Sequence, residues 1–149
     1  MLESHIRRIL RPQAVSPPRR GETRRMKMRG IRGAITVDAD EPQAILDATK
    51  RLLTEMTERN GIELDDIASV LFSMTPDLHA AFPALGAREM GWVHVPMLHF
   101  TEIDVPGAMA RCVRVLMHVE TERKQAEIEH AYLEGAWVLR PDIAGKDSP

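Results

Sequence analysis

Apolar and polar positions change period along the chain after residue 28. Residues 30–37 are mostly apolar, are interrupted by glycine, and predict a strand. Asp40, Glu41 and Pro42 then give a helix start, with an acidic N-cap, an acid in the first turn and an early proline. The Asn60-Gly61 pair is typical of a helix end. The helix between them carries one apolar face, formed by Ile45, Leu46, Leu52, Leu53 and Met56.

Later segments favour further strands and one short helix. Residues 67–74 are apolar enough for a strand buried on both faces. Residues 84–90 predict the short helix, and 93–100 a strand in which Pro96 indicates an edge or a bulge. Residues 112–120 form the clearest strand, while 128–139 fit either a strand or a helix.

This element order predicts an α+β fold, with a small mixed β-sheet and helices on one face. Such a fold has one helix layer, so the other face of the sheet needs a different cover. A homo-oligomer supplies it most simply, since identical chains usually assemble symmetrically.

Composition narrows the class of protein. The 149 residues, 44% hydrophobic and 28% charged, suit one globular domain with a tail and exclude a wholly disordered chain. No apolar run reaches the ~18 residues that span a membrane. Cys112 is the single cysteine, which excludes an intrachain disulfide and cysteine-rich zinc modules, and we expect it to be a buried structural thiol. The histidines lack metal-ligand spacing, so we expect no metal. The absence of a disulfide framework suits a reducing compartment, so we expect a cytoplasmic protein.

Charge divides the chain unevenly. The net charge is −2, yet residues 1–27 carry about +6 and the remainder about −8. An acidic body argues against a general nucleic-acid binder. We interpret residues 1–27 as a disordered basic extension, or as the result of a start codon assigned too early, since Met26 and Met28 both lie directly before the first predicted strand. A basic arm that contacts RNA or acidic lipid is the other interpretation. Residues 28–142 then form the domain, and 143–149 a flexible tail.

Arginines in apolar surroundings are the main chemical signal. Arg114 alternates with valines in the clearest strand, Arg32 lies between Ile31 and Gly33, and Arg88 lies on the short helix. A guanidinium stays charged in a protein, so a buried one needs an anionic partner. These arginines either pair with internal acids such as Glu102 or form a pocket for a ligand that bears carboxylates.

Several segments in order resemble a known family. They are Arg29–Ala34 with Thr36-Val37, Thr75–His79 with Phe82-Pro83-Ala84, Val95-Pro96 with Glu102, Asp104–Gly107, Arg114-Val115-Leu116, His130–Leu133 and Leu139–Asp142. Together they resemble the trimeric, monofunctional bacterial chorismate mutases of the AroH class. The resemblance runs from about Met28 to Asp142.

The resemblance implies a homotrimeric pseudo-α/β-barrel with active sites between adjacent subunits. It also implies the conversion of chorismate to prephenate in phenylalanine and tyrosine biosynthesis. The reaction rearranges one molecule, so it needs no cofactor. Catalysis depends on holding the reactive conformer and on stabilising the charge that develops.

The resemblance also implies residue roles. Arg114 is expected to donate to the ether oxygen, Arg32 to bind a carboxylate, and Glu102 to accept from the substrate hydroxyl. Arg88 is expected to add positive charge from the neighbouring subunit. Tyr132 is expected to bind a carboxylate, and the pocket walls to include Phe82, Ala84 and Leu139.

Three positions depart from the family pattern. Leu85 replaces a lysine, and Leu98 and His99 replace two adjacent small polar residues. Leu98 and His99 still belong to the expected substrate-binding set. These departures leave two other interpretations open. One is a catalytically weak trimer that only binds a metabolite. The other is an enzyme like the reactive-intermediate deaminases, which act on imino acids and use an intersubunit arginine.

Overall fold

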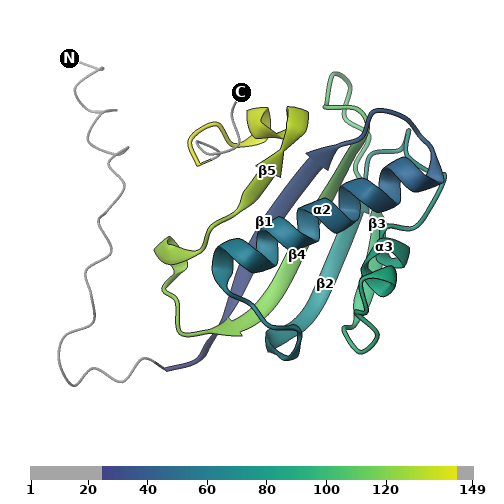
Figure 1. Ribbon diagram of the computed structural model, residues 1–149. Helices are drawn as coiled ribbons and strands as arrows, with labels where there is room; N and C mark the ends of the chain where they lie inside the picture. Colours follow the sequence, from purple (N-terminus) through teal and green to yellow (C-terminus); the bar gives the residue numbers. More distant parts are fainter. Residues whose placement is uncertain (1–24, 144–149) are drawn as a thin grey trace, which may run out of the picture.

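The computed structural model describes residues 25–143, so most of the expected N-terminal extension and nearly all of the C-terminal tail lie outside the described residues. Within that range the strands form one mixed sheet in the order β3-β2-β4-β1-β5 (Figure 1). Strand β4 pairs antiparallel with both β1 and β2, whereas the β1–β5 and β2–β3 pairs are parallel. The strands are β1 (Lys27–Thr36), β2 (Ile67–Met74), β3 (Met97–Thr101), β4 (Cys112–Thr121) and β5 (Ala131–Leu133).

Two α-helices cover one face of this sheet, as the sequence predicts. The long helix α2 (Pro42–Asn60) lies across the central strands, and the short helix α3 (Pro83–Glu89) lies beside β3 (Figure 1). The apolar face of α2 packs on alternate residues of β4, of which Val113, Val115 and Met117 are fully buried. The described chain contains no helix that is both long and apolar enough to cross a membrane.

Gly33 in the middle of β1 is explained by the packing of α2. A Cβ atom at this position would lie 2.3 Å from Sδ of Met56, which is far inside van der Waals contact. The glycine therefore allows helix α2, and not a ligand, to approach the strand. At the other end of α2, Gly61 has φ of 62° and its backbone N–H donates to carbonyls of the last helical turn.

The structure corrects the predicted start of α2. Glu41 is the N-cap residue, and no side chain caps the helix. Asp40 instead accepts hydrogen bonds from the backbone N–H groups of His79 and Ala80, both at 2.9 Å. The carboxylate therefore ties the loop that leads to α3 to the beginning of α2.

Three strand predictions are also refined. Strand β3 begins after Pro96, four residues later than predicted. In this single chain β2 is well buried on its helix-facing side only. The undecided segment 128–139 contains both kinds of structure, a three-residue strand β5 followed by a 3₁₀ helix (Glu134–Leu139).

Candidate active site

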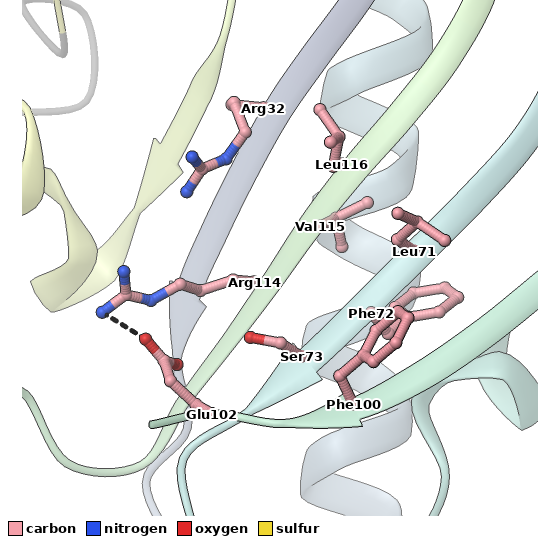
Figure 2. A pocket seen from close by; sticks show the side chains of 9 residues that line it. All are labelled: Arg32, Leu71, Phe72, Ser73, Phe100, Glu102, Arg114, Val115 and Leu116. Carbon is pink, nitrogen blue, oxygen red and sulfur yellow. Dashed lines mark ion pairs between the residues drawn. The ribbon is translucent and has the colours of Figure 1, made fainter. Parts of the chain in front are cut away.

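The sheet face opposite the helices carries two of the three predicted arginines, Arg32 and Arg114. Arg114 on β4 pairs with Ala34 on β1 and with Ser73 on β2, and Arg32 pairs with Leu116. Residues opposite each other in a sheet point to the same side, so all of these side chains share one face, which we call the open face. A hollow of about 270 Å³ lies on this face, and Figure 2 shows the side chains that line it. Its lining includes Arg32, Leu71, Ser73, Phe100, Glu102, Arg114 and Leu116.

An ion pair marks one end of the hollow. Nη2 of Arg114 lies 2.9 Å from Oε1 of Glu102, which follows β3 (Figure 2). Two further atoms of the pair, Nε of Arg114 and Oε2 of Glu102, are buried and have no hydrogen-bond partner among residues 25–143. Buried polar atoms are normally satisfied. The pair therefore offers a ligand one cationic donor and one anionic acceptor side by side.

The residues just before Arg114 fix where β4 begins. Arg111 has a left-handed backbone with φ of 48°, and its N–H donates to Asp77 at 2.8 Å. Thr75 accepts from the N–H of Cys112 at 3.0 Å. Hydrogen bonds from Thr75 and from the backbone of Arg111 lower the pKa of Asp77. The Thr75-Pro76-Asp77 turn thus sets the alternation that brings Arg114 onto the open face.

Cys112 is buried beneath this face, as predicted for a structural thiol. Burial raises its pKa, although the positive charge of Arg114 opposes the shift. A thiol held in its neutral form is a poor nucleophile. Cys112 is therefore a packing residue under the arginine.

Arg32 and Tyr132 come from neighbouring strands on the other side of Arg114. Tyr132 pairs with Ala34, so its ring lies on the open face, where it is 2% exposed. Leu139 packs against the small cluster that contains Tyr132 and Cys112. Within residues 25–143 the guanidinium of Arg32 forms no ion pair, and in Figure 2 it extends over the same side of the sheet as Arg114.

The remaining predicted site residues lie elsewhere, at the edge formed by β3 and α3. Arg88 is exposed on α3, Phe82 just before that helix is 67% exposed, and Leu98 on β3 is 56% exposed. Ala84, by contrast, is fully buried in the core. None of these residues lines the hollow around Arg114. One chain therefore presents the predicted site in two parts.

His99 does not point to the open face, because it pairs with Phe72 on the helix-facing side. Its Nε2 accepts a hydrogen bond from the N–H of Ala84 at 3.1 Å, and its ring stacks on Phe72 with 5.4 Å between centroids. Burial, and then the charge of Arg88, lower its pKa below the usual 6.5. In the single chain the His99 side chain is thus directed away from Arg32 and Arg114, and it accepts a hydrogen bond at the start of α3.

This geometry predicts an acid-sensitive contact at His99. A lowered pKa means that the unfolded state binds the proton more readily, so the contribution is complete above pH 6.5 and is lost as the pH falls towards the pKa in the folded protein. Losing one hydrogen bond costs about 1 kcal/mol, or roughly 2–4 °C in Tm. As the pH falls, the Tm of the wild type should therefore drop relative to that of His99→Gln, whose amide oxygen does not titrate in this range. An unchanged difference would contradict the assignment.

The comparisons with known proteins decide the family. The sequence model of chorismate mutase type I matches residues 28–143. The chain belongs to the type I chorismate mutases. It is 48% identical to the chorismate mutase AroH of Bacillus subtilis over 120 residues, covering 80% of this chain and 94% of that protein. It is also 48% identical to the AroH protein of Thermus thermophilus over 117 residues, covering 78% and 96%.

A solved structure supports the same assignment for the fold. The chorismate mutase from Clostridium thermocellum superposes with a TM-score of 0.72 at 50% identity, covering 73% of this chain and 97% of that one. The α+β fold with a mixed sheet is thus confirmed, and the interpretation as an imino-acid deaminase is not supported. Chorismate mutases are isomerases, and this chain is one of that class.

Ser73 and Phe100 are among the residues of this chorismate mutase's hollow that the sequence did not predict. Both line it and pair with each other across β2 and β3. The signal was present, because alternation places Ser73 out of phase with the buried Val70 and Phe72. A small polar residue in an apolar strand was simply less conspicuous than an arginine.

Proposed function

We propose that the chain converts chorismate to prephenate on the open face of its sheet. The observation that carries this proposal is the Arg114–Glu102 pair, with its unused buried donor and acceptor, on the same face as Arg32. Chorismate has two carboxylates, a hydroxyl and an ether oxygen that becomes negative as its bond breaks. A donor, an acceptor and a second cation match these groups.

Each residue then has a role that its position supports. Arg32 binds a carboxylate, because its guanidinium fork fits carboxylate geometry and has no ion-pair partner within residues 25–143. Glu102 accepts from the substrate hydroxyl through Oε2. Arg114 donates to the ether oxygen, where negative charge grows in the transition state. The Arg114–Glu102 contact fixes this donor before the substrate arrives, which is what makes electrostatic stabilisation effective.

We further propose that the site is completed by a second copy of the chain in a homotrimer. Phe82, Arg88 and Leu98 are exposed at the β3–α3 edge and do not reach Arg114 in their own chain. Apart from the small cluster that Tyr132 and Cys112 form with the last 3₁₀ helix, the open face has no covering layer within the described chain, since both α-helices lie on the other side (Figure 1). Placing the edge of one subunit over the open face of the next covers apolar surface and adds Arg88 to the site.

We also propose that residues 28–142 suffice for this activity and that the enzyme acts in the cytoplasm. The full chain and a variant that begins at Met28 should both remove the diene absorbance of chorismate, with kcat/KM values within about twofold of each other. Acid treatment should convert the product to phenylpyruvate, which identifies prephenate. Folded protein that binds chorismate without turnover would favour the metabolite-binding interpretation instead. Activity in the full chain alone would contradict the proposed domain boundary.

A further inference from the structure

Strand β5 is very short, yet it carries Tyr132 into the site. Its three residues pair with Gly33, Ala34 and Ile35 of β1. Side chains of α2 hold the segment that leads into it. Asn60 donates to the carbonyl of Glu129 at 2.7 Å and accepts from its N–H at 2.8 Å. Arg59 donates to the carbonyl of His130 at 3.3 Å.

The ring of His130 continues the β1–β5 pairing beyond the end of the strand. Its Nδ1 accepts a hydrogen bond from the backbone N–H of Arg32 at 2.9 Å. The next residue of β1, Gly33, already pairs with Ala131 of β5. The imidazole thus accepts the hydrogen bond that a carbonyl of a neighbouring strand would otherwise accept from Arg32. The side chain of Arg32 faces the proposed substrate site. The imidazole therefore joins the backbones that carry Arg32 and Tyr132.

Positive charges surround this ring. Arg32 faces it from β1 and Arg140 from the segment after the last 3₁₀ helix, while Arg59 of α2 donates to the backbone carbonyl of the same residue. The acids nearby are Glu129, next in sequence, and Glu55, which pairs with Arg59. Burial, followed by the charges of Arg32 and Arg140, lowers the pKa of His130 below the usual 6.5. The neutral ring, whose Nδ1 can accept, is therefore the form that fits the structure.

We propose that neutral His130 is a positioning residue for Arg32 and that its protonation weakens substrate binding. The proposal rests on the proposed carboxylate-binding role of Arg32. Protonated Nδ1 carries a hydrogen that would face the N–H of Arg32, so the contact becomes a clash of two donors. The contact between β1 and β5 then weakens, and the distance between Arg32 and Tyr132 is no longer fixed.

The effect should fall on KM more than on kcat. Arg32 holds a carboxylate that is charged both in bound chorismate and in the transition state, so it contributes uniform binding. Arg114, which acts on the ether oxygen, lies one strand away and is held by Glu102. We therefore expect KM to rise on acidification, with kcat nearly constant.

The test measures kcat and KM between about pH 5 and 8, together with the NMR titration of the His130 ring. In the wild-type trimer KM should rise at low pH with the midpoint of the ring titration. His130→Gln keeps a neutral acceptor, so it should hold KM within about threefold of the wild-type value at pH 8 and remove the acid rise. His130→Leu removes the acceptor and should raise KM about tenfold at every pH.

The outcomes separate this inference from the role of Arg32. An acid rise in KM that persists in folded His130→Gln would overturn the role of His130, as would a ring titration that does not coincide with the KM midpoint. An unchanged KM in Arg32→Ala would instead remove the proposed carboxylate contact. Loss of all activity in the wild type would contradict the proposed reaction itself.

Discussion

Replacing Arg114 with alanine is expected to lower kcat/KM for chorismate by about a thousandfold or more. In the proposed mechanism the side chain supplies a preorganised cation at the atom where charge develops, a role that differs from the carboxylate binding proposed for Arg32. Removing Arg114 also leaves the half-buried Glu102 carboxylate without its ion-pair partner, in a site meant for a dianion. Both effects act on the transition state, so kcat should fall more than KM rises.

Two variants control for charge and for general damage. Arg114→Lys keeps the charge but not the planar fork, and should still lose most activity. Arg29→Ala removes another arginine of the sheet, one that donates to the carbonyl of Arg123 and does not line the hollow, and should remain within about threefold of wild type. Assembly should be intact in all three. Turnover near the wild-type rate in Arg114→Ala would remove this residue from the mechanism.

Leu116→Glu is expected to break the proposed trimer and to abolish turnover with it. Leu116 lies near the middle of the open face, between Arg32 on β1 and Leu71 on β2. Burying an unpaired carboxylate at an interface costs several kcal/mol, on the order of 3–5 for a buried charge that lacks its partner. In the proposed arrangement, loss of the neighbouring subunit also removes Arg88 and Phe82 from the surroundings of Arg114.

The matched control for this prediction is Leu64→Glu. Leu64 is 41% exposed on the 3₁₀ turn (Leu64–Asp66) between α2 and β2, so the same substitution there should leave both mass and activity unchanged. Light scattering after size exclusion gives the mass, and chorismate depletion gives the rate. A fully active trimer with glutamate at position 116 would show that the open face is not the interface.

Periodicity predicted most of the fold because each element carries its own signal. In β4 the apolar residues alternate without a break, and this alternation alone placed Arg114 and Val115 on opposite faces, as observed. The segment around β5 carried no such signal. It is only three residues long and is held by Asn60 and His130, whose contacts are remote in sequence. Contacts between residues that are far apart in the sequence produce no regular spacing of apolar residues, so periodicity could not predict this strand.

The site was predictable only as far as side-chain direction follows from strand alternation. Arg32, Arg114 and Tyr132 share a face because their strands pair in a fixed register. His99 shows the limit of the argument, since its neighbour Leu98 points outwards and the ring of His99 lies under α3. The start of β3 was predicted too early, and a later start does not change its phase. The pairing of β3 with β2 determines that Leu98 lies on the open face and that His99 lies on the helix-facing side.

The most direct test of the account mixes two defective subunits. Arg114→Ala protein carries an intact β3–α3 edge, and Arg88→Ala protein, which we expect to be about tenfold slower than wild type, carries an intact open face. If neighbouring subunits share each site, randomly reassembled equimolar trimers contain about one fully intact site in four. The rate should then rise to about a quarter of the wild-type value, several times the average of the two separate variants. If mixed trimers are shown to form and their rate equals the average of the two separate variants, this result would contradict a site built from two subunits.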